Sequence, residues 1–158
     1  MTVETLAAAL EREHHEIDEG ISEFVSRLGA GETRVEALSK ALDALKRHIY
    51  LEEAFLFPPM RHGGLMAPIF VMIREHGQMW RLMDDLLQQA SAGGDAAILR
   101  DICDQLTGSL EAHNFKEERV IYPQADASLS PEATAELHQF LGTGSMPAGW
   151  VCQGAAGP

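Results

Sequence analysis

The sequence has few cysteines, few basic residues and few aromatic side chains, and it lacks any long hydrophobic run. Two cysteines among 158 residues cannot form a disulfide framework, so we expect a reducing, cytoplasmic environment. The 12 Lys and Arg residues are outnumbered by 24 Asp and Glu residues, and the net charge of −12 disfavours nucleic acid and anionic membranes as partners. No apolar stretch approaches the ~20 residues of a membrane span, and no signal peptide is recognisable.

What the sequence does have is helical periodicity over most of its length. Apolar residues recur every three or four positions in four long segments, approximately 3–28, 35–57, 65–90 and 96–122. The breaks between them are rich in glycine and proline, and Pro58 and Pro123 are expected to stop the second and fourth helices. Thr33 with Glu36 fits a capping box that would start the second helix.

These segments predict an all-α protein, an antiparallel up-down four-helix bundle with a short fifth helix and an irregular C-terminal tail. The fifth helix is expected to start at Ser130 and to end at Gly142. We therefore divide the chain into a bundle over residues 1–125 and a short helix with a tail, residues 126–158, that packs on the bundle.

One short pattern occurs twice. His48 and Glu52, four residues apart, recur 65 positions later as His113 and Glu117, and each copy is followed by an aromatic residue and a proline. A second repeat, Arg-Glu-His, ends at His14 and again at His76, 62 positions later. An imidazole and a carboxylate four residues apart lie on the same face of a helix.

Six residues of this repeat fill the gaps in the apolar stripes of the four helices. They are His14, His48, Glu52, His76, His113 and Glu117. Burying so many ionisable groups at one level is costly unless a strong common partner neutralises them. Two metal ions would satisfy all six, as two halves of a dinuclear site. Imidazole with carboxylate favours iron, with zinc or manganese as possible substitutes.

The neighbours of these six residues are out of register with the stripes. His15 is expected at the surface or outside the ligand set, and Glu53 and Glu118 are expected to be solvated or to accept a ring N–H from a ligand histidine. The ferritin-like pattern of four Glu and two His with Glu-x-x-His spacing is not present, which argues against a ferritin-like protein. Cys103 is expected in the core and Cys152 as a free thiol in the tail.

The combined pattern, over roughly residues 5–125, resembles the hemerythrin-like (HHE cation-binding) family. The resemblance implies a non-heme di-iron centre in a four-helix bundle. It implies that Glu52 and Glu117 bridge the two irons, that the four histidines are terminal ligands, and that an oxo or hydroxo group is the third bridge.

The resemblance is incomplete at one ligand. Oxygen-carrying hemerythrins have His-x-x-x-His on the third helix, whereas Trp80 follows His76 here. Each metal would then keep an open position, unless water, His15, Tyr50 or another side chain fills one. We expect a pocket lined by groups such as Phe55 and Trp80 that binds O2 or NO for storage or sensing.

Two other functions stay open at this point. One is an enzyme that reduces or disproportionates peroxide or reduces NO, with Tyr50 and Tyr122 as possible proton or electron donors. The other is an iron donor similar to iron–sulfur-cluster repair proteins, which usually carry an additional N-terminal cysteine-containing segment that is not seen here. Either function would involve a redox or acceptor protein as partner; the sequence does not indicate the oligomeric state.

Overall fold

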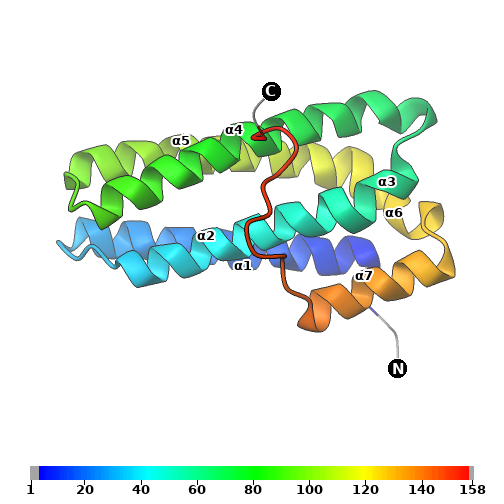
Figure 1. Ribbon diagram of the computed structural model, residues 1–158, viewed down its shortest axis with the longest axis horizontal. Helices are drawn as coiled ribbons and strands as arrows, with labels where there is room; N and C mark the ends of the chain where they lie inside the picture. Colours follow the sequence, from blue (N-terminus) through cyan, green and yellow to red (C-terminus); the bar gives the residue numbers. More distant parts are fainter. Residues whose placement is uncertain (1–3, 157–158) are drawn as a thin grey trace.

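The computed structural model describes residues 4–156, and every regular element in that range is a helix (Figure 1). The predicted all-α fold class is therefore confirmed. Four long helices form the body: α1 (Leu6–Gly29), α2 (Val35–Leu51), α4 (Met66–Ser91) and α5 (Ala96–Lys116). The shorter elements are η1 (Glu52–Leu56), α3 (Phe57–Met60), η2 (Gly63–Leu65), η3 (Glu117–Ile121), α6 (Tyr122–Ser128) and α7 (Pro131–Thr143). None of the helices in the described range is long and apolar enough to cross a membrane.

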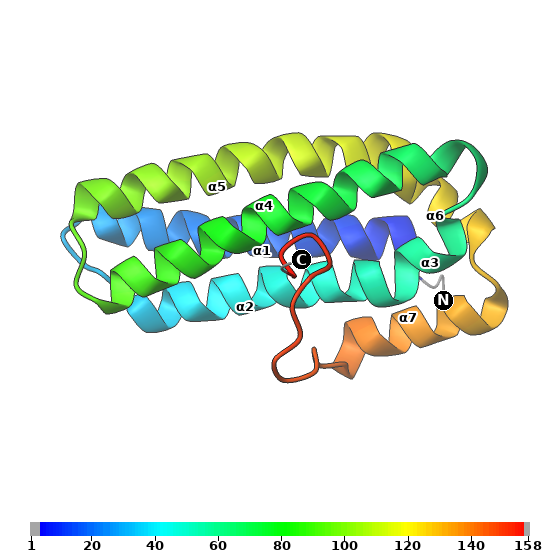
Figure 2. The same cartoon turned by 45° about the horizontal axis from the view of Figure 1, so that its top comes forward.

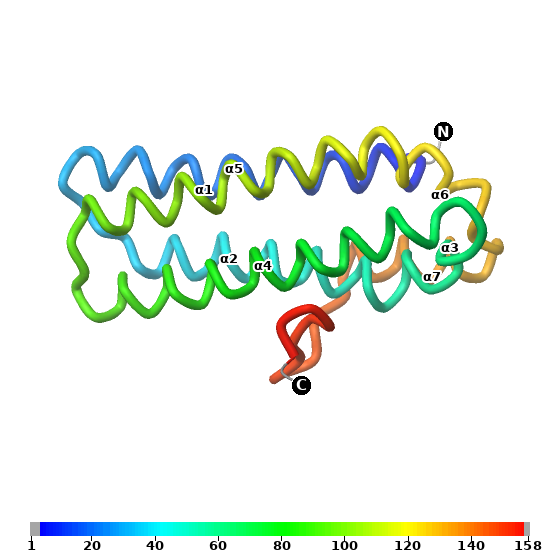
Figure 3. Tube along the Cα trace, turned by 90° about the horizontal axis from the view of Figure 1, so that it is seen from above, coloured from blue at the N-terminus to red at the C-terminus, as the bar shows by residue number. Residues whose placement is uncertain are grey.

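The long helices pack side by side around one elongated interior. α1 contacts α2 and α5, and α4 contacts α5 and α2, so that α1 and α5 lie over α2 and α4 (Figure 3). The buried apolar residues form two clusters, one around Phe24, Leu45 and Leu106 and the other around Leu10, Phe57 and Ile121. The six residues singled out by the repeat lie along the helices between these clusters and are the polar layer of the core.

Two π-helical turns, η1 and η3, shift the register of the core. Each begins at a glutamate of the repeat and inserts a wider turn into an otherwise continuous helix. An extra residue per turn moves the inward-facing positions one residue along the chain. In unbroken α-helices Phe55 and Val120 would continue the apolar stripes to the core. Instead Phe55 is partly exposed and Val120 is 41% exposed, and the next residues, Leu56 and Ile121, are fully buried.

The expectation that proline stops the second and fourth helices is wrong. Pro58 and Pro123 both lie in the first turn of a new α-helical segment, α3 and α6, and the chain continues as helix to Met60 and Ser128. The preceding π turn places each proline where its missing N–H and fixed φ are tolerated.

Side-chain caps start three of the helices. Thr5, Asp95 and Ser130 each accept a hydrogen bond from a backbone N–H in the first turn of α1, α5 and α7. The predicted capping box is wrong, because α2 begins at Val35, its N-cap is Arg34, and no side chain caps it. The fifth helix ends at Thr143, close to the predicted end.

The tail after α7 crosses α2 and ends against α4 (Figure 2). Although it has no regular structure, its Cys152 is fully buried as a free thiol, and Trp150 packs edge-on against Trp80 with ring centroids 5.6 Å apart. Cys103 is fully buried in the core of α5, as expected. The tail is therefore an integral part of the α2–α4 side of the molecule.

Candidate metal centre

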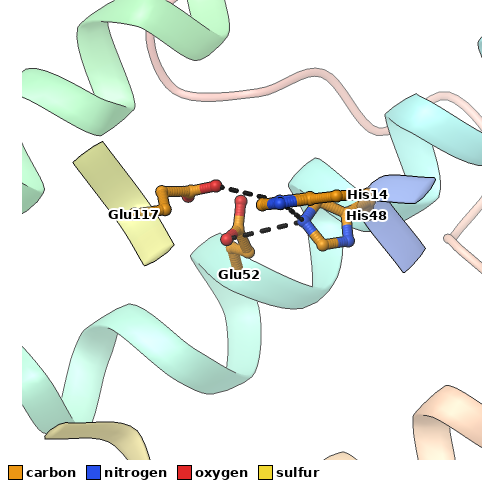
Figure 4. Close-up of side chains that lie close together, drawn as sticks. All are labelled: His14, His48, Glu52 and Glu117. Carbon is orange, nitrogen blue, oxygen red and sulfur yellow. Dashed lines mark hydrogen bonds and ion pairs between the residues drawn. The ribbon is translucent and has the colours of Figure 1, made fainter. Parts of the chain in front are cut away.

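The six buried polar residues converge at one level of the bundle. They are His14 from α1, His48 from α2, Glu52 from η1, His76 from α4, His113 from α5 and Glu117 from η3, and none is more than 3% exposed. They form two groups, His14–His48–Glu52–Glu117 and Glu52–His76–His113–Glu117, in each of which the ligand atoms lie within 4.8 Å of one another. The first group is drawn in Figure 4. Both carboxylates belong to both groups, as a pair of bridging ligands would.

The donor atoms of the second group fit a cation. His76 Nε2 lies 3.1 Å from Glu52 Oε1, and His113 Nε2 lies 3.2 Å from Glu117 Oε2. Within the described residues, none of these four buried atoms has a hydrogen-bond partner. Unpartnered buried polar atoms are rare because leaving them so is costly. Two imidazoles and two carboxylates aimed at one point are the donor set that a divalent metal accepts.

A layer of outer carboxylates orients three of the histidines. Glu13 accepts from His48 Nδ1 at 2.9 Å, Glu53 from His76 Nδ1 at 2.7 Å, and Glu75 from His113 Nδ1 at 3.0 Å. These bonds leave each Nε2 facing the site and fix the ring orientation that metal binding needs. The expectation for Glu53 is therefore confirmed.

The outer carboxylates are themselves held by other groups. Arg47 donates to Glu13 at 2.9 Å, Lys116 pairs with Glu75, and the backbone N–H of Gln153 in the tail donates to Glu53 at 2.9 Å. Arg47 also donates to the carbonyls of Phe140 and Gly144 at the end of α7. The C-terminal elements are thus connected to the candidate site through charged hydrogen bonds.

The fourth histidine differs from the others. His14 Nδ1 lies 3.9 Å from Glu118 Oε1, beyond hydrogen-bond length, and has no partner within the described residues. His15 is exposed, as expected from its register. Tyr50, considered as an extra ligand, packs its ring against Phe140 and Trp150, which makes it part of the apolar contact with the tail.

The residue that the register argument missed is Tyr122. Its side chain is fully buried, and its hydroxyl lies 2.7 Å from Glu52 Oε2 and 3.2 Å from Glu117 Oε1. The same oxygen lies 2.9 Å from His14 Nε2 and 3.1 Å from His48 Nε2. The sequence suggests Tyr122 as a proton or electron donor but not as a residue inside the ligand layer, because an unbroken α-helix places position 122 away from the face of position 117. The equivalence of its Tyr-Pro to Phe57-Pro58 was the available signal.

Nearby carboxylates and burial have opposite effects on the pKa values of the buried histidines. Burial alone would lower the pKa of His48 and His113, but the charge and hydrogen bonds of Glu52, Glu117 and the outer carboxylates raise both pKa values to about 10. Burial, and then the charges of Glu117 and Glu52, raise the pKa of Tyr122 well above its ordinary value. The carboxylates thus hold the imidazoles of His48 and His113 protonated in the metal-free protein, and a cation that enters would take the place of those protons.

A family model described as the hemerythrin HHE cation binding domain matches residues 5–125. The chain belongs to this hemerythrin family. Among curated proteins, "Iron-sulfur cluster repair protein YtfE" of Yersinia pseudotuberculosis serotype IB (strain PB1/+) is 34% identical over an alignment of 99 residues, which covers 56% of this chain and 44% of that protein. The chain thus spans less than half the length of this relative. No solved structure gives a significant match.

A cavity of about 570 Å³ opens between α1 and α5 of this hemerythrin domain. It is lined by His14 and by the acidic residues Asp18, Asp104, Glu111 and Glu118, together with apolar side chains. It lies on the side of the bundle away from the tail. Phe55 and Trp80, expected to line the ligand pocket, do not line this cavity, and Phe55 borders a separate hollow beside Phe140 and Gly144.

The hemerythrin site predicts opposite pH responses for the metal-free and metal-loaded protein. The pKa values of His48 and His113 rise from 6.5 to about 10 on folding, so their stabilisation of the metal-free fold is complete below pH 6.5 and is lost as the pH rises through about 10. Metal binding requires neutral imidazole, so the loaded protein loses metal as the pH falls. Thermal unfolding of both forms at several pH values measures this. A metal-free protein that gains stability between pH 7 and about pH 10 would contradict the prediction.

Proposed function

We propose that this hemerythrin domain is an up-down four-helix bundle that holds two non-heme iron ions. His14 and His48 would ligate one ion, His76 and His113 the other, with Glu52 and Glu117 bridging. The observation that carries the proposal is that both buried ligand groups share the same two carboxylates. Four imidazoles with two carboxylates favour iron, and zinc or manganese would be substitutes. An oxo or hydroxo bridge between the ions is part of the proposal.

The proposed role of the centre is to bind O2 or NO for storage or sensing. Reduced iron supplies the affinity for such ligands. The protein excludes water with the apolar clusters on both sides of the ligand layer and keeps the ligand rings in place with the outer carboxylates. Held in this way, His48, His76 and His113 present Nε2 to the centre without rearrangement, which supports tight binding of metal and little movement when a ligand arrives.

The cavity between α1 and α5 is the proposed entry route. Its acidic lining would repel anions such as nitrite or superoxide and would not hinder neutral O2, NO or H2O2. Ile21, Val25 and Phe115 add apolar surface suited to a small uncharged ligand. The same charge would attract Fe²⁺, so this route also serves loading of the centre.

A second candidate function is peroxide or NO reduction, and the position of Tyr122 favours it. Its single O–H can donate to Glu52 Oε2 at 2.7 Å or to Glu117 Oε1 at 3.2 Å, and it is the one O–H group hydrogen-bonded to the ligand layer among the described residues. It could deliver a proton to an oxygen ligand. A third candidate function is iron donation for cluster repair. It is supported by the name of the similar Yersinia protein, of whose length the match covers 44%.

Stopped-flow mixing of the reduced, iron-loaded protein with O2 or NO tests the proposal. A stable adduct that dissociates when the ligand is removed is the expected result. A matched sample loaded with zinc controls for effects of the fold alone. Steady-state loss of H2O2 or NO faster than with the same amount of free iron would assign the enzymatic function instead. Absence of both an adduct and turnover would reject both functions.

A further inference from the structure

The two halves of the proposed centre are related by the internal repeat. Glu13 holds His48 in the first half as Glu75 holds His113 in the second. Each pair of equivalent residues is separated by 62 or 65 positions in the sequence. The two metal positions should therefore have matching surroundings. A chemical difference between them is expected where equivalent positions of the two copies hold different residues.

The repeat is broken at Phe57 and Tyr122. Each follows a bridging glutamate by five residues, is the first residue after a π turn and precedes a proline. Each ring also lies beside a ligand histidine. Phe57 stacks on His76 with ring centroids 5.7 Å apart, and the ring centroids of Tyr122 and His14 are 5.3 Å apart. The two rings are thus equivalent in position, and the chemical difference between them is one hydroxyl group.

That hydroxyl divides the donor atoms of the centre into two classes. It lies 2.7–3.2 Å from one donor atom of each residue in the group of His14, His48, Glu52 and Glu117. The four donor atoms of the other group, Glu52 Oε1, His76 Nε2, His113 Nε2 and Glu117 Oε2, have no hydrogen-bond partner in the described part of the chain. One metal position therefore has a fifth protein donor atom beside it, the Tyr122 oxygen, whereas the equivalent ring at its counterpart is Phe57, which offers no ligand atom.

From this we propose that Tyr122 ligates the metal between His14 and His48, which leaves the metal between His76 and His113 as the one with the open position. This inference rests on the dinuclear centre proposed above. The hydroxyl oxygen lies among the four donor atoms of the group of His14 and His48, 2.7–3.2 Å from each, so a cation that they bind would displace it a short way and keep it as the adjacent donor. On binding, the phenol O–H bond breaks heterolytically, the oxygen–metal bond forms, and the proton leaves to the solvent without a change of oxidation state.

The positive charge of a bound metal would stabilise the negatively charged, deprotonated form of Tyr122. Burial and two carboxylates disfavour a negative oxygen in the metal-free protein, but a bound cation reverses that balance, as it does for metal-bound water or thiol. Phenolate oxygen is a hard donor that suits ferric iron. The missing fifth imidazole of oxygen-carrying hemerythrins would then be replaced by an oxygen ligand on the other metal.

Optical and resonance Raman spectra of the oxidised, iron-loaded protein test this assignment. Wild-type protein should show a visible phenolate-to-ferric charge-transfer band with enhanced tyrosine ring vibrations. Tyr122→Phe should lose both signals and bind one of its two irons roughly 10- to 100-fold more weakly. The Tyr50→Phe variant is the matched control, since Tyr50 packs against the tail, and its spectrum should equal that of wild type.

A reciprocal variant strengthens the test. Phe57 occupies the equivalent place, so phenylalanine is accommodated beside the site and Tyr122→Phe is expected to fold. Phe57→Tyr in the Tyr122→Phe background should restore a phenolate band at the other metal. Two bound irons with the same spectrum in wild type and Tyr122→Phe would overturn the Tyr122 assignment alone. A wild-type protein that binds no iron would overturn the dinuclear centre and this inference with it.

Discussion

Replacing Glu52 with glutamine is expected to remove both metal ions from the protein. Glu52 belongs to both ligand groups, so the Glu52→Gln substitution takes a negative charge from each metal at once. The side chain is fully buried and its size is nearly unchanged, which keeps a packing cavity from explaining the loss. We expect each metal to bind at least roughly 10- to 100-fold more weakly. Elemental analysis after purification in iron-supplemented medium measures the effect.

Two variants control for that result. Glu36→Gln makes the same chemical change at an exposed position of the preceding helix α2, and it should keep the full metal content. His15→Ala removes an exposed imidazole next to His14 and should also keep it. Full iron content in Glu52→Gln would show that this carboxylate is not a shared ligand. Stoichiometric loss in His15→Ala would show that the assignment of His14 by helical register is wrong.

The burial of the six candidate ligands could be predicted from the sequence because each helix has a gap in its apolar stripe. A histidine at position 14 between Leu10 and Ile17 must face the core if those two do, and the structure places all three inside. The same argument finds His76 between Met72 and Met79. That these residues bind metal stays a prediction, which their mutual distances support.

The part of the site beyond each glutamate could not be predicted by the same periodicity. A π turn changes the number of residues per turn without a clear signature in composition, so positions after Glu52 and Glu117 were assigned one residue too early. Uninterrupted periodicity would put Val120 in the core and Tyr122 outside the ligand layer, whereas Val120 is 41% exposed and Tyr122 is fully buried. Comparison of the two copies of the repeat was a better guide there than periodicity, because it pairs Tyr122 with Phe57.

The docking of the tail was also beyond sequence reasoning. Residues 144–156 contain no periodic apolar pattern, and their position depends on single contacts. The backbone of Gly154 lies against Gly77 of α4, where a Cβ on Gly77 would come 2.4 Å from the Gly154 carbonyl. Nothing in a glycine inside a helix indicates which segment approaches it. The contact matters to the centre, since the neighbouring Gln153 N–H donates to Glu53 and Glu53 holds His76.

Gly77→Ala is therefore expected to release the tail while leaving α4 helical. Alanine favours a helix over glycine by about 1 kcal/mol, but its methyl group would overlap the Gly154 backbone, and overpacking costs about 1–3 kcal/mol. Release would expose Cys152, whose pKa burial and Glu53 now raise to about 11. Its rate of labelling by a thiol reagent should rise by roughly 10- to 100-fold, the factor that corresponds to this energy.

Gly108→Ala provides the matched control for that experiment. Gly108 lies within α5, and a Cβ there meets no other atom within 4 Å. This variant should gain the helix propensity of alanine without touching the tail, so Cys152 should stay protected and thermal stability should rise slightly. Cys103 serves as an internal reference, because it is fully buried in the core of α5 and should remain unreactive in both variants. Equal protection of Cys152 in Gly77→Ala and Gly108→Ala would mean that the tail does not depend on close approach to α4.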